Sequence, residues 1–247
     1  MVGMLVGMTG VGGGSLMTPI LVLLFGFHPA TAVGTDLLYA SVTKTVGTAV
    51  HGTRKTVDWR IVAGLAMGSV PAAIITLFAM SRLGATGSHT QILNLLLGAA
   101  LLLTAIATYF RPVILKWTGA HFHPHGRTQI SVWTVLIGVT LGVLVSITSV
   151  GAGALGTTAL LILYPRLPIA KIAGSDIAHA VPLTLIAGIG HWLMGSVNFG
   201  LMGALLVGSI PGVIIGSLLA SRTSDDVLRP VLAVTLLVVS VKLLLLV

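Results

Sequence analysis

The sequence predicts an all-α polytopic membrane protein made of two homologous halves, and three observations predict it. Hydrophobic residues make up 55% of the 247-residue chain and charged residues 7%, with a mean hydropathy of +1.09. Soluble domains carry about 25% charged residues, so this chain cannot cover itself against water. The apolar runs lack the period-2 alternation that a membrane β-barrel requires, which leaves helices. Short motifs then recur in order in the two halves.

Eight apolar segments follow one another, and most approach the ~20 residues that a helix needs to cross the hydrocarbon core. They cover residues 1–27, 31–50, 61–80, 91–110, 130–164, 169–194, 201–220 and 227–247. We expect a first repeat of four segments at residues 1–112, a linker at 113–127 and a second repeat of four at 128–247. The histidine-bearing linker is expected to be a polar loop.

The second half repeats motifs of the first half at a spacing of about 140 residues. The pairs are Gly12-Gly13-Gly14 and Gly151-Ala152-Gly153, Gly34-Thr35-Asp36 and Gly174-Ser175-Asp176, His51 and His191, Val57-Asp58-Trp59 and Val197-Asn198-Phe199, and Gly68-Ser69-Val70-Pro71 and Gly208-Ser209-Ile210-Pro211. The second half has one residue more between Pro168 and Asp176 than the first has between Pro29 and Asp36. A duplicated apolar chain with matching glycine breaks is typical of transporters whose site lies between the repeats.

Loop charge favours a first segment that turns back in each half. If all eight segments cross, the basic loop residues divide 7 against 5 between the two sides, which is no orientation signal. If the first and fifth segments are re-entrant hairpins, the division is 10 against 2, and each half has an odd number of crossings. The two halves would then be inverted repeats. Residues 132–149 count against this arrangement, because they are long enough to cross alone.

The glycine breaks are candidate anion sites. A break leaves amide N–H groups at the start of a half-helix, where the helix dipole places about half a positive charge. Candidate substrate-binding residues at the two breaks are Gly12, Gly13, Gly14, Ser15, Thr18, Gly151, Gly153, Thr157 and Thr158. The alternative is that the glycines only permit tight helix packing.

Ionisable residues inside the apolar segments form the second group of candidates. Asp36, Lys44 and His51 fall within a sector of about 80° on one helix. The second half has Asp176, His179 and His191, with Thr184 in place of a lysine. Because a charge in hydrocarbon normally faces a cavity or a partner, Lys44 is the best candidate for substrate binding. We expect the two aspartates and three histidines to gate or to couple protons; helix capping and structural hydrogen bonds are the alternatives.

With these motifs the chain resembles the sulfite exporter TauE/SafE family of bacterial membrane proteins. The matching residues are Gly10 to Gly14 followed by Pro19, then Ala32-Val33-Gly34-Thr35, and His51-Gly52 with Val57-Asp58-Trp59 downstream. The second half carries a weaker copy, in which Thr158 replaces the proline. The resemblance implies a secondary transporter of sulfur-containing anions such as sulfite, sulfoacetate or other sulfonates.

The predicted function is therefore export of a small sulfur-containing anion across the bacterial inner membrane by alternating access. The expected partners are the anion, membrane lipids and a coupling ion, either a proton or sodium; a homo-oligomer is left open. The net charge of +8 lies mainly in short loops, so we expect no nucleic acid. No metal or other cofactor is expected, and no phosphate-binding loop is present in the sequence. A passive anion channel and an intramembrane hydrolase using Ser15 are the alternatives, although a Gly-x-Ser-x-Gly elbow is lacking.

Overall fold

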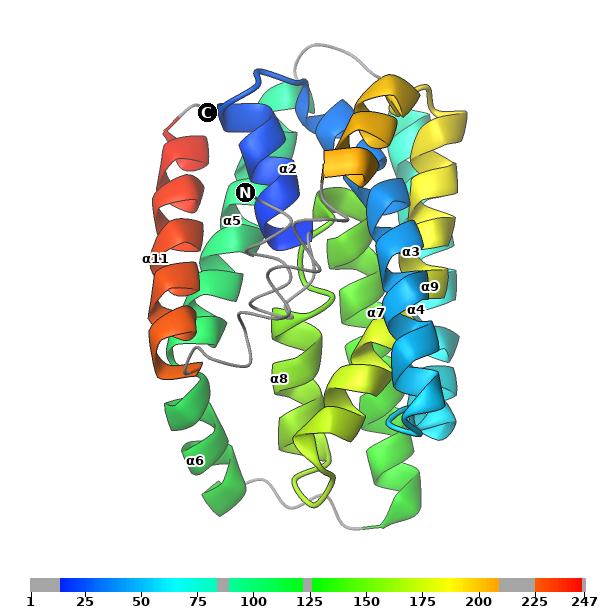
Figure 1. The fold of residues 1–247 in the computed structure, drawn as a ribbon, viewed down its shortest axis with the longest axis vertical. Helices are drawn as coiled ribbons and strands as arrows, with labels where there is room; N and C mark the ends of the chain where they lie inside the picture. The colour runs from blue at the N-terminus through cyan, green and yellow to red at the C-terminus, as the bar shows by residue number, and fades with distance from the viewer. Residues whose placement is uncertain (1–13, 84–88, 122–125, 209–224, 246–247) are drawn as a thin grey trace.

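The computed structural model describes residues 14–83, 89–121, 126–208 and 225–245, and within these ranges the regular structure is helical. The predicted site residues Gly12 and Gly13 lie outside the described residues. The helices, shown in Figure 1, are α2 (Gly14–Leu23), α3 (Pro29–Thr53), α4 (Trp59–Leu83), α5 (His89–Tyr109), α6 (Arg111–His121), α7 (Arg127–Thr148), α8 (Ala154–Leu163), α9 (Ile169–Leu193), a short helix at Phe199–Gly208, and α11 (Asp225–Leu244).

Four of the described helices are long and apolar enough to cross a membrane. They are Trp59–Arg82, Gln91–Tyr109, Thr128–Thr148 and Ile169–Leu193. Shorter apolar helices cover Ala154–Leu163, Phe199–Gly208 and Pro230–Leu244. The prediction of an all-helical polytopic membrane protein is confirmed at this level. Helix α3 is as long as α9, at 25 residues, and each carries one aspartate and one lysine, but α3 is less apolar because it has several threonines where α9 has one.

The bundle has an apolar outer surface and buries polar side chains within a mostly apolar interior, as expected for a protein whose solvent is lipid. Large apolar side chains such as Ile75, Leu103 and Val238 are exposed on the outer helices. Polar side chains such as Ser69 and His179 are fully buried. A soluble domain of this size would expose more charged residues and fewer large apolar ones. The centre of the bundle is therefore where a polar solute would meet matching groups.

Helices α3 and α9 pack against each other and run in opposite directions (Figure 1). Two equivalent hydrogen bonds join the halves. The amide of Asp58, after α3, donates to Ser175 Oγ on α9 at 2.8 Å, and the amide of Asn198, after α9, donates to Thr35 Oγ1 on α3 at 3.0 Å. Each half thus caps the loop of the other.

The glycine before each of these hydroxyl residues makes the close approach possible. A Cβ on Gly34 would clash with the carbonyl oxygen of Ser196, and one on Gly174 with that of Thr56. The repeated motif Gly-Thr/Ser-Asp therefore has a clear structural meaning. Its glycine admits the opposite loop, its hydroxyl accepts an amide from that loop, and its aspartate points into the bundle, where it is buried.

The fifth apolar segment is broken. Helix α7 ends at Thr148, residues 149–153 form a loop, and α8 begins at Ala154. Ser149, Gly151 and Gly153 have φ of 58°, 118° and 130°, a region that favours glycine. In Figure 1, α7 rises from the lower end and α8 returns to that end from mid-height. Helix α2, also of 10 residues, runs from mid-height to the upper end.

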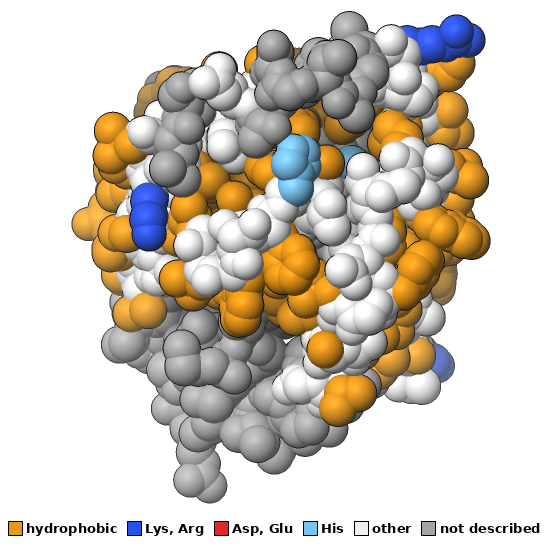
Figure 2. Space-filling view, turned by 90° about the horizontal axis from the view of Figure 1, so that it is seen from above, with side chains coloured by type: hydrophobic (Ala, Val, Ile, Leu, Met, Phe, Trp, Pro, Cys, Tyr) orange, Lys and Arg blue, Asp and Glu red, His pale blue; other side chains and the backbone are white. Residues whose placement is uncertain are grey.

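The two ends of the bundle differ in charge. Basic residues at the lower end in Figure 1, where α3 ends and α4, α7 and α9 begin, are Arg54, Lys55, Arg60, Arg127, Arg166 and Lys171. Arg82 and Lys242 lie at helix ends on the upper side. Figure 2 looks onto this upper end, where apolar and uncharged side chains predominate and basic ones are sparse.

The linker is not the polar loop expected from the sequence. Residues 111–121 form α6, which follows α5 directly and contacts α8 as well as α5. The prediction was wrong because the apolar residues Val113, Ile114 and Leu115, which favour a packed helix, precede the linker histidines. His123 and His125 lie outside the described residues.

Glycines also allow α4 and α7 to pack closely. A Cβ on Gly68 would meet the carbonyl oxygen of Val135, and one on Gly138 would meet that of Leu65. Backbones in such contact tolerate no side chain between them, as is common for small residues at membrane helix interfaces.

We predict that Gly138→Ala lowers the free energy of unfolding by about 1–3 kcal/mol, because the added methyl group overpacks the α4–α7 contact. The loss should appear as a lower melting temperature of the purified protein in detergent. Gly203→Ala is the control, since a Cβ there meets nothing within 4 Å. Equal melting temperatures of the two variants would contradict the packing argument.

Candidate functional site

The first buried carboxylate of the site collects hydroxyl groups from both halves. Asp36 on α3 is 0% exposed. Its Oδ2 accepts hydrogen bonds from Thr18 Oγ1 on α2 at 2.6 Å and from Ser149 Oγ, directly after α7, at 2.9 Å. Its Oδ1 has no hydrogen-bond partner within the described part of the chain. Asp36 therefore ties the α2 half-helix to the α7–α8 break.

The second buried carboxylate has an equivalent but poorer environment. Asp176 on α9 is 2% exposed, and its Oδ2 accepts one hydrogen bond, from Thr157 Oγ1 on α8 at 3.1 Å. Its Oδ1 also has no partner among the described residues, and Gly156 packs directly against it. Thr18 precedes Asp36 by 18 residues and Thr157 precedes Asp176 by 19, which matches the extra residue of the second half.

Lys44 supplies a positive charge that the two carboxylates share. It lies on α3, about two turns after Asp36, and is half-buried. Its Nζ donates to the carbonyl oxygen of Ala152 in the α7–α8 break at 3.4 Å. Asp176 and Asp36 both attract it electrostatically. At the corresponding place on α9, Thr184 donates to Ala180 of its own helix at 2.7 Å, so the second half contributes no cation here.

Two buried histidines of α9 contact neighbouring helices. His179 follows Asp176 by one turn, and its Nε2 lies 2.8 Å from Ser69 Oγ on α4. His191 Nε2 lies 2.8 Å from the carbonyl oxygen of Ser146 on α7. Since a carbonyl only accepts, the ring proton of His191 is on Nε2. The Nδ1 atoms of both rings have no partner among the described residues.

The third histidine lies at the opposite end of the α3–α9 pair. His51 is partly exposed near the end of α3, with Nδ1 2.8 Å from Thr56 Oγ1. It packs beside Gly174, whereas His191 packs beside Gly34. Each histidine therefore accompanies the aspartate motif of the other half, one at each end of the bundle.

The remaining predicted residues divide between the break and a neighbouring groove. Gly151 and Gly153 lie in the α7–α8 break, Gly14 begins α2, and Ser15 follows within α2. Thr157 and Thr158 point to different surroundings: Thr157 reaches Asp176, and Thr158 donates to Ala154 of its own helix at 2.7 Å.

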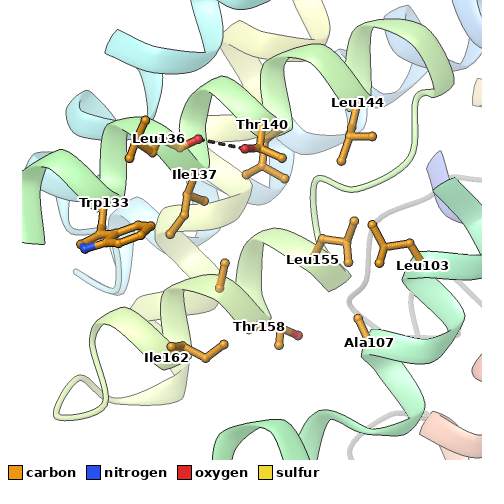
Figure 3. Close-up of a pocket in the computed structure, with 12 residues that line it drawn as sticks. Leu103, Ala107, Trp133, Leu136, Ile137, Thr140, Leu144, Leu155, Thr158 and Ile162 are labelled. Carbon is orange, nitrogen blue, oxygen red and sulfur yellow. Dashed lines mark hydrogen bonds between the residues drawn. The ribbon is translucent and has the colours of Figure 1, made fainter. Parts of the chain in front are cut away.

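Thr158 lines an open, mostly apolar groove between α5, α7 and α8, with a volume of about 320 Å³ (Figure 3). Thr140, across the groove on α7, donates to the carbonyl oxygen of Leu136 at 3.0 Å. Both hydroxyl protons are thus committed to the helices themselves, and no charged residue lines the groove. An anion would find better partners at the Lys44 cluster than in this groove.

Sequence reasoning missed three serines of the site. The hydroxyl of Ser69 bonds His179, the hydroxyl of Ser149 bonds Asp36, and Ser146 accepts from His191 through its backbone carbonyl oxygen. Ser149 stands two residues before Gly151, so its position at the break was a usable signal. Ser69 belongs to a repeated motif, but only the packing of α4 on α9 brings it to His179.

A helical bundle that holds a half-buried lysine at a helix break, in electrostatic interaction with two buried aspartates, has the architecture of a membrane transporter. Comparison of the sequence with known proteins agrees: the model of the family described as sulfite exporter TauE/SafE matches residues 1–243, and the chain belongs to this family.

Relatives in Bacillus subtilis (strain 168) carry names of the same kind. The chain is 40% identical over 246 residues to "Probable membrane transporter protein YjnA", covering 98% of this chain and 95% of that protein. It is 28% identical over 208 residues to "Probable membrane transporter protein YdhB", covering 82% and 79%. No solved structure matches the chain. The protein is thus a multi-pass membrane transporter.

We predict that Thr157→Val destabilises the protein by about 1–3 kcal/mol, because it removes the hydroxyl donor of a buried carboxylate while keeping the side-chain shape. Melting temperatures in detergent would measure the loss. Thr158→Val, one residue along the same helix, is the matched control, since its hydroxyl bonds only its own helix. A Thr158→Val protein as unstable as Thr157→Val would contradict the assigned role.

Proposed function

We propose that this protein is a secondary transporter that exports small sulfur-containing anions, such as sulfite or the sulfonate sulfoacetate, across the bacterial inner membrane by alternating access. The observation that carries the proposal is the half-buried Lys44, whose ammonium group lies against the backbone of a helix break. A lysine within the hydrocarbon core costs at least ~2.5 kcal/mol on insertion scales, so it is expected to serve a function there.

The break supplies the second part of the anion site. Ala152, which accepts from Lys44, lies two residues before the start of α8. The start of a helix carries a partial positive charge that favours anions. An oxyanion between Lys44 and this helix start would interact with a full and a partial positive charge at once. Thr157 lies in the first turn of α8, and its hydroxyl, which donates to Asp176, links this helix start to the second buried carboxylate.

The predicted site residues take these roles in the proposal. Lys44 and the two breaks bind the anion; the residues of the breaks are Gly12, Gly13, Gly14, Ser15, Thr18, Gly151, Gly153 and Thr157. Thr158 is assigned to the wall of α8 rather than to the anion, because its hydroxyl bonds Ala154. The gating or proton-coupling groups are Asp36 and His191 toward one end and Asp176, His179 and His51 toward the other.

Alternating access would follow from an inverted relation between the halves. Three features support this relation: α3 and α9 are antiparallel, α2 and α8 leave mid-height in opposite directions, and the caps between the halves are reciprocal (Figure 1). By the positive-inside rule, the basic lower end is cytoplasmic. The site would then open toward either side by rocking of one half against the other.

Transport by Lys44→Gln is the direct test. We expect sulfite or sulfoacetate uptake into proteoliposomes to fall by about tenfold or more, since a lost interaction of ~1.4 kcal/mol already corresponds to a factor of ten. Lys116→Gln is the control, because Lys116 is exposed on α6. Wild-type counterflow would support a carrier, whereas flux without counterflow would favour a channel. Full transport by Lys44→Gln would contradict the proposed site.

Cysteine labelling tests the inverted arrangement in the membrane, and the chain has no cysteine of its own. We expect a membrane-impermeant maleimide added to intact cells to label Arg82→Cys but not Arg166→Cys, because these positions lie at opposite ends of the bundle. Permeabilised cells should show labelling at both positions. Labelling of both positions from the outside in intact cells would contradict the arrangement.

A further inference from the structure

The buried cluster has more negative than positive groups. With all three residues ionised, Asp36, Asp176 and Lys44 sum to a charge of −1. The described helices around them bring no further charge close to the cluster. Helices α2 and α8 contain no aspartate, glutamate, lysine, arginine or histidine. The arginines of α4 and α7 lie at the helix ends, at Arg60, Arg82 and Arg127. On α9 itself, His179 is the other titratable side chain that interacts electrostatically with Lys44. An anion entering this cluster would raise its negative charge further.

The two carboxylates differ in what stabilises their charge. Asp36 accepts two hydroxyl hydrogen bonds, at 2.6 and 2.9 Å, whereas Asp176 accepts one, at 3.1 Å. Asp176 therefore depends more on the charge of Lys44. Its Oδ1 is buried and has no partner among the described residues, so this oxygen is available to hold a proton while Oδ2 keeps its bond to Thr157.

We infer that the transported anion is bound together with one proton, and that Asp176 is the residue that takes this proton. The inference rests on the proposed function, because it assumes that Lys44 binds the anion. When the anion engages Lys44, Asp176 loses its counter-charge. One O–H bond forms at Asp176 Oδ1 with a proton from water, and Asp36 remains a carboxylate held by two hydroxyls.

Charge balance gives the direction of coupling. A proton on Asp176 cancels one unit of the negative charge that the anion brings. The cluster stays at −1 with a monovalent anion, and reaches −2 rather than −3 with a divalent one such as sulfoacetate. A proton and an anion in one site favour each other's binding by linkage. They are consequently carried in the same direction, as in symport, and sodium is not required. Asp176 lies near the start of α9, on the basic side of the bundle, where it meets water when the site opens to that side.

The test is the pH dependence of sulfoacetate binding to the full-length protein in detergent, measured by calorimetry from about pH 6 to about pH 9. Both acidic groups of sulfoacetate are ionised throughout this range, so a proton taken up on binding goes to the protein. For the wild type we expect the Kd to rise by up to about tenfold per pH unit. Binding in a weakly buffered solution should also take up about one proton per anion.

Variants separate the two carboxylates. Asp176→Asn, which imitates the protonated acid, should bind sulfoacetate with a Kd independent of pH. Asp36→Asn and the control Asp58→Asn, outside the bundle core, should keep the wild-type slope. If Asp176→Asn does not fold, two other measurements test the inference. The wild type should take up a proton on binding, and Asp176→Glu should keep the dependence of the Kd on pH.

The outcomes distinguish this inference from the proposed function. Sulfoacetate binding with a flat pH profile and no proton uptake in the wild type would overturn the coupling and leave the anion site standing. A full slope in Asp176→Asn would overturn the assignment to Asp176. Absence of binding at every pH would overturn the proposed function, and this inference with it.

Discussion

The burial of two carboxylates, Asp36 and Asp176, inside an apolar bundle is the constraint on which the rest of the structure depends. Unpaired charges in a lipid-facing bundle are expensive, so the groups that carry and satisfy them must meet at its centre. Asp36 and Lys44 come from α3, Asp176 from α9, and the hydroxyl donors from α2, α8 and the end of α7. Helices that stop at mid-height are what allows these donors to reach the carboxylates. The break at residues 149–153 therefore serves the polar centre and is more than a point of flexibility.

The scaffold around this centre is two-fold, but its contents are not. The motif Gly-Thr/Ser-Asp performs the same three tasks in each half: close approach, capping of the opposite loop and delivery of a carboxylate. The lysine has no such counterpart, because Thr184 takes its place on α9. The hydroxyl donors are also unequal, two for Asp36 and one for Asp176. The same motif thus makes the same contacts in each half, while a single lysine interacts with the aspartates of both.

Much of this arrangement was predictable from the sequence, and the failures have identifiable causes. Composition was enough for the helical membrane class, and helical spacing placed Asp36 and Lys44 on one face. The roles of Thr157 and Thr158 could not be separated, since that choice depends on how a half-helix of 10 residues is rotated about its axis. The bond from Ser149 to Asp36 spans 113 residues and exists only once α3 and α7 both pack against α9. Helix α6 was not predicted because its apolar run is short and the histidines that follow it are typical of a polar loop.

The positions of the caps between halves bear on how such a bundle could alternate. The Asn198–Thr35 bond lies at the upper end of the α3–α9 pair and the Asp58–Ser175 bond at the lower end (Figure 1). Opening either end breaks one of them, and a single hydrogen bond contributes only about 0.5–1.5 kcal/mol net. Because the two hydrogen bonds are similar and weak, they do not favour opening at one end over the other. The groups beside them are unequal: Asp36, with two hydroxyl donors, lies next to the Asn198–Thr35 bond, and Asp176, with one donor, lies next to the Asp58–Ser175 bond. A change of charge at Asp176 would affect the closure at its own end more than the other, so the asymmetry of the polar centre would make the two ends open unequally.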